Sequence, residues 1–291
     1  MTYQILNTLD KIIFCLLYMK KIKKLIILLA IILIFYLVFF YKNENFSKYE
    51  KISIKKKYIF IGGLHRSGTS ILNEIIGSSD KVAKHKNTGK PEDEGQHIQT
   101  VFDNGIAHGG VGRFCFDDNY HYTENNKLIT SDNKIKLLLE WNKYWDVSKS
   151  IFLEKSPVNL IHTRFLQKMF DNTYFIVIMR HPLAVSKASL KWNNQSLNKY
   201  FDHWLRGYDI FLNDSKYLRR YILIKYEDLC NDPQKEVKKI ENLIGEKLNI
   251  KDFELNRLYN SNSKYFIRLD SKLIDKYEKK FNKFGYSLKN V

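Results

Sequence analysis

Residues 58–70 read Tyr-Ile-Phe-Ile-Gly-Gly-Leu-His-Arg-Ser-Gly-Thr-Ser. The apolar run at 58–61 predicts a buried strand, because it is short, consists of β-branched and aromatic residues and is stopped by two glycines. Residues 70–76 continue with the spacing of an amphipathic helix. This order of strand, glycine turn and helix is typical of an α/β protein, and it places a polar loop at the end of a buried strand.

The rest of the chain repeats this alternation. Further short apolar runs begin at Ile151, Tyr174 and Tyr221. Helical spacing recurs between and after them, at 134–145, 158–170, 183–191, 198–213, 233–245 and 271–282. Buried strands that alternate with helices predict a parallel sheet with helices on both faces. No internal repeat or low-complexity linker follows residue 57, so we expect one α/β domain over residues 58–291.

The loop between the first strand and its helix has the composition of an anion-binding site. Glycines expose backbone N–H groups at a helix N-terminus, and the hydroxyls of Thr69 and Ser70 add further donors. Arg66 lies among these residues, which makes an ordinary turn between strand and helix the weaker interpretation. We therefore expect the loop to hold an anionic group.

The spacing of Gly63 and Gly68 is that of a nucleotide P-loop, but Thr69 stands where the P-loop lysine belongs. A kinase or NTPase also needs an aspartate at the end of a later strand to hold Mg²⁺. The apolar run at 174–179 is followed by Arg180 instead. Because a cation there suits a second phosphate, the sequence predicts a P-loop-like domain that binds a nucleotide anion without a metal.

Four motifs, taken together, resemble those of the sulfotransferases that use 3′-phosphoadenosine 5′-phosphosulfate (PAPS). They are RSGTS at 66–70, EKSP at 154–157, MRHP at 179–182 and YEDLCNDP at 226–233. They occur in the family's order over most of residues 58–245. No single motif is decisive, and the resemblance depends on all four together. The resemblance implies the family's α/β fold and a transferase of the membrane-anchored carbohydrate or tyrosyl-protein type. PAPS would be its co-substrate, and no metal is expected.

The resemblance also assigns residues that bind the donor nucleotide. The first loop is expected to hold the 5′-phosphosulfate through Arg66, Ser67, Gly68, Thr69 and Ser70. Arg180 matches the arginine that binds the 3′-phosphate. Tyr226 matches a tyrosine that contacts adenine, with a core aromatic at a strand end as the alternative. The family's serine partner of the arginine lies eight residues later, where this chain has Ala188 between Ser186 and Ser189; we assign the role to Ser189.

Sulfuryl transfer needs a base for the acceptor hydroxyl and cations for the group that moves. In membrane-anchored members of the family the base is a glutamate shortly beyond the donor loop, and this chain offers Glu92, Asp93 and Glu94 there. We assign Glu94, with a solvated acidic turn as the alternative. Lys155 resembles a lysine that lies near the transferred group. Glu94, Lys155 and Arg66 are therefore the predicted catalytic residues.

Other polar segments are assigned from their position alone. The glycine-rich stretch His108–Arg113 follows no strand and is expected near the acceptor cleft. Lys264 and Arg268 precede the last helical pattern and are expected to close over the nucleotide. His85 and His97 are isolated histidines and are not expected to act as bases.

The N-terminal region is both basic and apolar. The chain has 291 residues and a net charge of +17, of which residues 1–57 carry +8. Residues 25–41 are 17 residues without a charge, and four lysines within 20–24 precede them. That length spans a thin bilayer, and the positive-inside rule places residues 1–24 in the cytosol. We expect a transmembrane anchor at 25–41, a stem at 42–57 and a catalytic domain in a Golgi-like lumen.

A cleaved signal peptide is the alternative interpretation of the apolar run. It would require a small-x-small cleavage site, and none follows residue 41. We therefore expect a single-pass type II membrane protein. In an oxidising lumen Cys115 and Cys230 would be able to form disulfides, although the sequence does not pair them.

The first functional hypothesis is transfer of a sulfuryl group from PAPS to a hydroxyl or amine of a glycan. Two alternatives stay open: a tyrosyl-protein acceptor, and an inactive membrane-tethered protein that binds the nucleotide. Binding of nucleic acid has only the basic charge in its favour, because no motif of interleaved basic and aromatic residues occurs.

Overall fold

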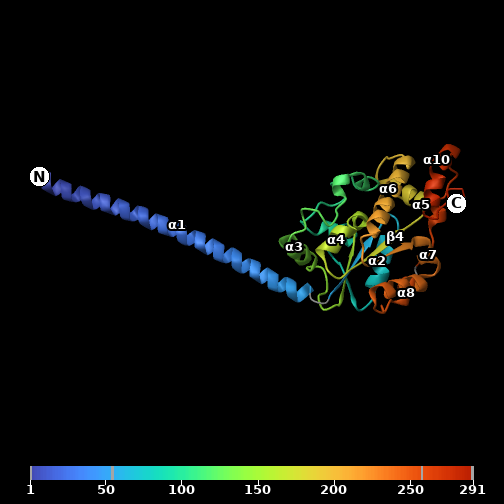
Figure 1. Cartoon of the computed structure of the whole chain (residues 1–291), viewed down its shortest axis with the longest axis horizontal. Coiled ribbons are helices and arrows are strands. Elements are labelled where there is room, and N and C mark those ends of the chain that lie inside the picture. Colours follow the sequence, from blue (N-terminus) through green and yellow to red (C-terminus); the bar gives the residue numbers. More distant parts are fainter. Residues whose placement is uncertain (1, 54–55, 257, 290–291) are drawn as a thin grey trace. The chain divides into compact units, whose positions relative to one another are not determined.

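Two units make up the chain in the computed structural model (Figure 1). The structure describes residues 2–53, 56–256 and 258–289. The units are Met1–Ile52 and Ser53–Val291. The second unit contains the predicted catalytic domain, and each unit is described by itself.

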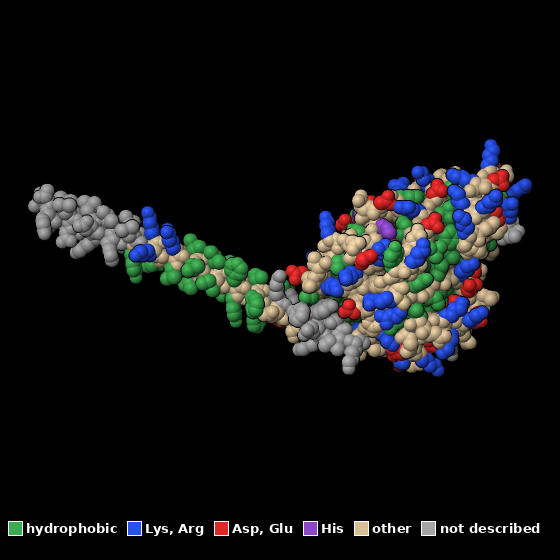
Figure 2. Space-filling model, in the orientation of Figure 1, with side chains coloured by type: hydrophobic (Ala, Val, Ile, Leu, Met, Phe, Trp, Pro, Cys, Tyr) green, Lys and Arg blue, Asp and Glu red, His purple; other side chains and the backbone are tan. Residues whose placement is uncertain are grey.

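The first unit is helical. Its helix, α1, covers Thr2–Ser53. Among the described residues, Tyr18–Tyr41 is the one helical segment, 24 residues in length, that is long and apolar enough to cross a membrane. The anchor predicted at 25–41 lies inside it, and Figure 2 shows lysine side chains gathered at one end of its apolar stretch. The predicted stem is helical up to Ser53.

The second unit is built on a five-stranded parallel sheet. Its strands are β1 (Lys57–Gly62), β2 (Val82–Lys84), β3 (Ile151–Lys155), β4 (Thr173–Met179) and β5 (Tyr221–Lys225). They lie in the order β2-β3-β1-β4-β5, and all neighbours are parallel. The four strands predicted from apolar runs are confirmed. The edge strand β2 is too short to show a pattern in the sequence.

Helices connect and follow the strands. They are α2 (Thr69–Gly77), α3 (Ser131–Trp141), α4 (Thr163–Met169), α5 (Pro182–Ser189), α6 (Leu197–Ser215), α7 (Tyr226–Asn231), α8 (Pro233–Ile244), α9 (Asp252–Asn256) and α10 (Ser271–Asn282). The helix predicted at 158–170 is broken, because residues 157–161 form a 3₁₀ turn and α4 begins after it. Asn159 explains the break, since its side-chain amide donates to the carbonyl oxygen of Ile61 at 3.0 Å and ties the turn to β1.

The two faces of the sheet bury different kinds of side chain, because alternate residues of a strand point to opposite faces. One face is aliphatic: Ile59, Ile61, Leu153 and Ile176 pack with residues of α2 and α8. The other face is aromatic, with ring contacts among Tyr58, Phe60, Trp141, Phe152, Phe170 and Phe175. Helices thus cover both faces, as predicted.

The central strand, β1, is the point at which the strand order reverses. It pairs with β3 on one side and with β4 on the other. In open parallel sheets, ligands bind outside the carboxyl ends of the strands at such a point. The four sequence motifs follow β1, β3, β4 and β5, so the fold brings all of them to this edge.

Candidate active site

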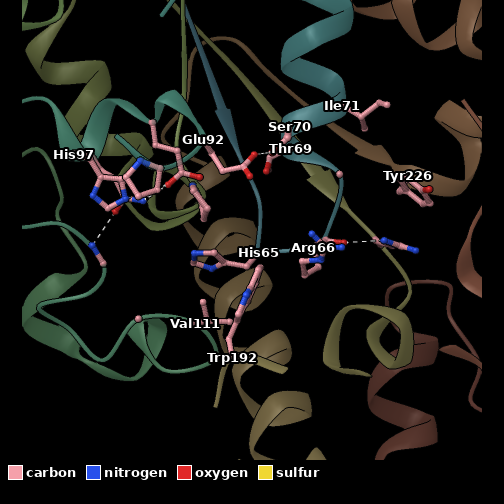
Figure 3. A pocket seen from close by; sticks show the side chains of 18 of the residues that line it. His65, Arg66, Thr69, Ser70, Ile71, Glu92, His97, Val111, Trp192 and Tyr226 are labelled. Carbon is pink, nitrogen blue, oxygen red and sulfur yellow. Dashed lines mark hydrogen bonds and ion pairs between the residues drawn. The ribbon is translucent and has the colours of Figure 1, made fainter. Parts of the chain in front are cut away.

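A cavity of about 570 Å³ opens at the carboxyl edge of the sheet. Its walls come from the loops after β1, β4 and β5, from the acidic turn at 91–97 and from the glycine-rich loop at 105–111. In Figure 3, Arg66 lies between Tyr226 on one side and His97 on the other. A concave site of this size suits a small-molecule ligand.

The loop after β1 turns sharply into α2 because glycines allow it. Gly68 caps α2 with a φ of 109°, and a Cβ on Gly63 would lie 2.5 Å from the carbonyl oxygen of Ile178. Arg66 itself is in the left-handed region with a φ of 68°, a strained conformation that concentrates at functional sites. Gly68 and Thr69 line the cavity, so the N-terminus of α2, a natural anion site, faces the ligand space.

Four of the five residues predicted in this loop line the cavity: Arg66, Gly68, Thr69 and Ser70. Ser67 does not. It is fully buried, and its hydroxyl donates to the carbonyl oxygen of Leu64 at 2.6 Å. That bond lies within the loop, so the side chain of Ser67 stabilises the loop and does not face the cavity.

Arg180 follows β4 and is held by neutral partners. It is 5% exposed, and it donates to Asn262 Oδ1 at 2.7 Å, to Ser261 Oγ at 3.0 Å and to the carbonyl oxygen of Arg66 at 3.0 Å. Among the described residues, no carboxylate lies within ion-pair distance of Arg180 or Arg66. A cation in a cavity without a counter-ion favours an anionic ligand.

Tyr226 joins the cavity wall to the core. The run predicted to continue the strand through this residue ends at Lys225, and Tyr226 begins α7. Its ring lies 4.3 Å from the guanidinium carbon of Arg180, and its hydroxyl donates to the carbonyl oxygen of Tyr259 at 3.0 Å. The ring both packs in the core and lines the cavity, so the two interpretations of Tyr226 are compatible.

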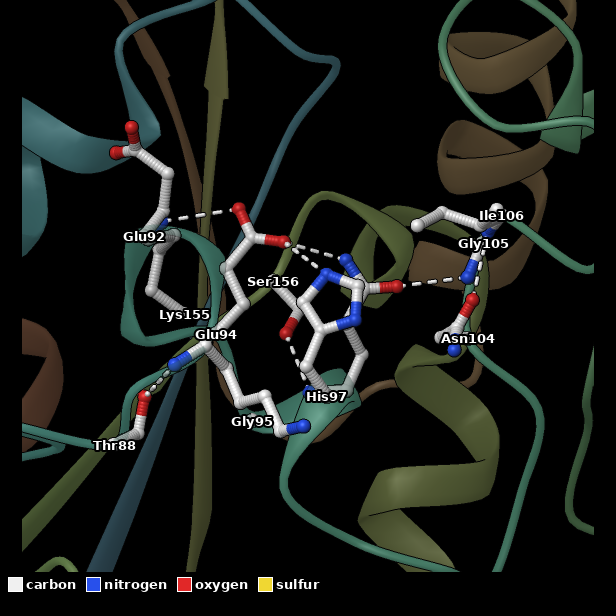
Figure 4. Close-up of polar contacts among 12 residues, drawn as sticks. Thr88, Glu92, Glu94, Gly95, His97, Asn104, Gly105, Ile106, Lys155 and Ser156 are labelled. Carbon is white, nitrogen blue, oxygen red and sulfur yellow. Dashed lines mark hydrogen bonds and ion pairs between the residues drawn. The ribbon is translucent and has the colours of Figure 1, made fainter.

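Glu94 is the buried carboxylate of the acidic turn, with 6% of its surface exposed. Its Oε1 accepts from Lys155 Nζ at 3.1 Å, and its Oε2 accepts from Gln96 Nε2 at 2.5 Å (Figure 4). The Nε2 of His97 lies 3.6 Å from Oε2. Burial favours the neutral acid, but His97 and the Lys155 ammonium lower the pKa of Glu94 below its ordinary value. Glu94 lines the cavity as an ionised group.

Lys155 lies behind Glu94. It is buried, and the residues that line the cavity do not include it. The structure thus brings Lys155 to the predicted base. The Lys155 ammonium contacts the Glu94 carboxylate and does not face the cavity.

Glu92 and Asp93 differ from Glu94 in exposure and partners. Glu92 lines the cavity and is exposed, and its Oε2 accepts from Ser70 Oγ at 2.9 Å. Asp93 turns away from the cavity and accepts from the backbone N–H of Thr88 at 2.8 Å. Glu94 is therefore the one buried carboxylate of the three, which fits its assignment.

Ser189 is not brought to the cavity. It is buried in α5, and its hydroxyl donates to the carbonyl oxygen of Val185 at 2.8 Å. Ser186 is also buried and lies outside the cavity wall. Ser261 and Asn262 hold Arg180 instead, from a segment that carries no sequence signal for this role. The donor-binding role of Ser189 stays a prediction without geometric support.

His65 and Trp192 are two of the cavity residues that the predicted set lacks. Burial lowers the pKa of His65 to about 4, so its ring is neutral at pH 7. Its ring meets that of Trp192 edge-on, with centroids 6.1 Å apart. The position of His65 directly before Arg66 was the available signal, whereas Trp192 had none. Val111, from the glycine-rich stretch, also lines the cavity, and the expected place of that stretch at an acceptor cleft stays a prediction.

The remaining predicted features have mixed outcomes. Lys264 Nζ donates to the hydroxyl of Tyr259, a cavity residue, at 3.0 Å, whereas Arg268 lines a separate hollow. Cys115 and Cys230 are free thiols. No group of three metal-ligating side chains occurs in the part of the chain that the structure describes.

A sequence comparison identifies the family. A model of the sulfotransferase family matches residues 58–249, which include β1 to β5 and all four motifs. The chain belongs to the sulfotransferase family.

Solved sulfotransferase structures resemble the chain. The chain resembles the sulfotransferase domain from the curacin biosynthetic pathway at 16% identity, with a TM-score of 0.51 over 80% of this chain and 99% of that one. The sulfotransferase STF1 of Mycobacterium tuberculosis H37Rv matches at 13% identity and a TM-score of 0.47, over 82% of this chain and 80% of that one. Mouse sulfotransferase SULT7A1 complexed with PAP matches at 14% identity and a TM-score of 0.43, over 82% of this chain and 88% of that one. A search among curated proteins returned no match.

Proposed function

We propose that the protein transfers a sulfuryl group from PAPS to a hydroxyl or amine of a glycan. The observation that supports this most is the pair Arg66 and Arg180, which face one cavity and have no carboxylate partner among the described residues. The N-terminus of α2 adds backbone donors beside Arg66. Together they suit a ligand with anionic groups at two places, as a sulfated nucleotide has.

Each part of the cavity then has a role toward the donor. The loop after β1, with Arg66, Thr69 and Ser70, holds the phosphosulfate. Arg180 holds the 3′-phosphate, and the ring of Tyr226 provides an apolar surface for the base. These three assignments use residues that line the same cavity.

In the proposed reaction, the acceptor oxygen attacks the sulfur atom. A bond forms between that oxygen and sulfur while the bond from sulfur to the phosphate oxygen breaks, which releases adenosine 3′,5′-bisphosphate. Glu94 takes the acceptor proton, and its lowered pKa keeps it ionised at neutral pH. Arg66 offsets the charge that develops on the leaving phosphate. Lys155 holds the carboxylate of Glu94 in place.

For the whole chain we propose a type II membrane protein with its catalytic domain in a Golgi-like lumen. The apolar segment Tyr18–Tyr41 and the lysines at 20–24 support this orientation. Protease added to sealed microsomes tests it: the catalytic domain should resist digestion until detergent is added, and digestion without detergent would contradict the proposal.

The activity is tested with the full-length chain in detergent, radiolabelled PAPS, and panels of glycans and tyrosine peptides. Label transferred to a glycan supports the proposal, and label transferred only to tyrosine peptides would replace the acceptor class. Calorimetric binding of adenosine 3′,5′-bisphosphate without any transfer would indicate the inactive tethered protein. Hydrolysis of ATP with Mg²⁺ and no use of PAPS would contradict the whole assignment.

A further inference from the structure

Three consecutive residues at the end of β3 bind three consecutive residues of the acidic turn. Glu154 Oε1 accepts from the backbone N–H of Gly95 at 2.9 Å, and Lys155 Nζ donates to Glu94 Oε1 at 3.1 Å. The backbone N–H of Gln96 donates to Ser156 Oγ at 3.1 Å. We call this contact between residues 94–96 and 154–156 the clasp; Figure 4 shows part of it and labels Glu94, Gly95, Lys155 and Ser156.

Glu154 is the deepest member of the clasp. It is 1% exposed and receives three hydrogen bonds: from Gly95 N–H, from Ser156 Oγ at 2.5 Å and from the side-chain amide of Asn159. The same Asn159 amide donates to the carbonyl oxygen of Ile61 at the end of β1. Glu154 therefore connects the acidic turn to the strand that carries the donor loop.

Gly95 is shaped to fit this carboxylate. A Cβ at this position would collide with Glu154 Oε1, so only glycine allows the backbone to approach so closely. On its other side, the carbonyl oxygen of Gly95 accepts from Trp141 Nε1 at 2.9 Å. The N–H and the carbonyl oxygen of Gly95 thus both have hydrogen-bond partners, and these two bonds fix the backbone next to Glu94.

Gln96 extends the same arrangement to the cavity. Its side-chain amide donates to Glu94 Oε2, and its Oε1 accepts from the backbone N–H of Gly105 at 2.8 Å. A shift of the turn would therefore move the Glu94 carboxylate and the start of the glycine-rich loop together.

We propose that Glu154 is a positioning residue, which sets the orientation of the Glu94 carboxylate through the backbone N–H of Gly95. The role rests on the proposed function, in which Glu94 is the base. Glu154 does not line the cavity, so it acts through the clasp and touches neither donor nor acceptor. Because proton transfer depends on the position of the base, a small displacement of the turn reduces the rate of the chemical step while the donor site stays intact.

The test replaces Glu154 by glutamine in the full-length chain. Glutamine keeps the size but points an NH₂ group at one of three donors, and Asn159 cannot turn away without losing its bond to Ile61. We expect kcat with radiolabelled PAPS to fall about ten- to a hundredfold, with the KM for PAPS and the calorimetric affinity for adenosine 3′,5′-bisphosphate within about twofold of wild type.

Glu241→Gln is the matched control. Glu241 is likewise buried and accepts from a backbone N–H, that of Leu248 at 2.7 Å, but it lies in α8 away from the cavity. It should lose stability to a similar degree and keep kcat. If E154Q keeps the kcat of E241Q, or if its kcat and nucleotide affinity fall together, the positioning role is wrong.

Ser156→Ala provides a second variant in case E154Q does not fold. It removes the acceptor of the Gln96 N–H and one of the three donors to Glu154, and it keeps the Glu154 carboxylate and its bond from the Gly95 N–H. Its kcat should fall by a smaller factor with nucleotide affinity unchanged, and a wild-type kcat would overturn the proposal. A wild-type chain that transfers nothing from PAPS would instead overturn the proposed function itself.

Discussion

At the scale of single residues, the buried and half-buried cations of the second unit differ in what neutralises their charge. Lys155 is paired with Glu94, and Arg164 is paired with Glu124 at 2.5 Å. Among the described residues, Arg66 and Arg180 contact neutral groups and aromatic rings and form no ion pair. Unpaired cations cost folding free energy unless a ligand compensates them, so these two arginines are the groups whose removal should affect binding most.

Replacing Arg180 or Arg66 by alanine should reduce PAPS turnover at least about a hundredfold, because each removes an electrostatic contact to an anionic group of the donor. The measurement is transfer of radiolabel, with thermal unfolding to show that the fold persists. Arg206→Ala is the control, since Arg206 pairs with Asp118 and lies outside the cavity wall. Wild-type turnover in R180A would remove Arg180 from the donor site.

Glu94→Gln should lower kcat about 10²- to 10⁴-fold while nucleotide binding persists, because a general base contributes about that factor. The base must be ionised, and its pKa is lowered in the folded protein. The acid limb of the wild-type pH profile should therefore lie below the ordinary glutamate pKa of about 4.3. A limb near pH 6 to 7 in kcat would indicate a histidine base instead.

At the scale of elements, the donor loop depends on its contact with β4. Gly63 has a φ of 150°, and its missing Cβ makes room for the carbonyl oxygen of Ile178. Because the obstacle is backbone, no side-chain rotation relieves it. The approach of the loop to β4 is what places Arg66 beside Arg180.

Gly63→Ala should destabilise the protein by more than about 2 kcal/mol, since it combines backbone strain with a steric collision. Gly245→Ala is the control: Gly245 has a φ of 65° in open space, so only the strain of about 1 to 2 kcal/mol remains. Denaturant unfolding of both variants measures the difference. Equal losses would show that the loop does not need the close approach to Ile178.

The elements also show how far the sequence predicts the fold. Four strands were predicted because each is a short apolar run with β-branched or aromatic residues. β2 has only three residues, and the break before α4 depends on a tertiary hydrogen bond of Asn159 that no local pattern contains. Short elements and long-range bonds are what sequence periodicity cannot show.

The candidate site follows the same division. Arg66 and Arg180 were predicted because each belongs to a motif at a strand end, and Glu94 because the family resemblance expects a glutamate shortly beyond the donor loop. The partners of Arg180, Ser261 and Asn262, come from a distant segment. They were missed, and Ser189 was assigned instead, because spacing along α5 does not show which way a hydroxyl points.

At the scale of the whole molecule, several histidines are buried, and burial is the main influence on their pKa. Burial lowers the pKa of His65 to about 4 and those of His85, His162 and His203 to about 3. In the unfolded chain each would titrate near 6.5. Their contribution to stability is therefore complete above about pH 6.5 and is lost as the pH falls toward the folded values.

Burial raises the pKa of Glu154 to about 7, although hydrogen bonds from Ser156 and Asn159 oppose it. The pH dependence of the Glu154 contribution has the opposite sign to that of the histidines. The stability that Glu154 contributes is present below its unfolded pKa and is lost as the pH rises through about 7. Because the histidines outnumber Glu154, a fall in pH from neutral should destabilise the protein more than a rise.

The melting temperature should therefore fall steeply between about pH 6.5 and 4, with each histidine adding up to about 1.4 kcal/mol per pH unit. His85→Phe isolates one contribution, because neither ring nitrogen of His85 has a hydrogen-bond partner among the described residues and its ring stacks on Trp145 at 4.7 Å. This variant should have a shallower acid slope in thermal unfolding. A slope equal to that of wild type would mean that His85 is not kept neutral by the fold.

The central position of β1 has a consequence for biosynthesis. Lys57 pairs with Ile151 and Tyr58 with Thr173, so the first strand to leave the ribosome has its partners about a hundred residues later, and such non-local pairing folds slowly. The apolar run at 58–61 must wait unpaired during that time, which favours a requirement for chaperones. The proposed donor site is complete only after Ser261 and Asn262, which hold Arg180, have been synthesised, so a nascent chain cannot bind a nucleotide early as a folding aid.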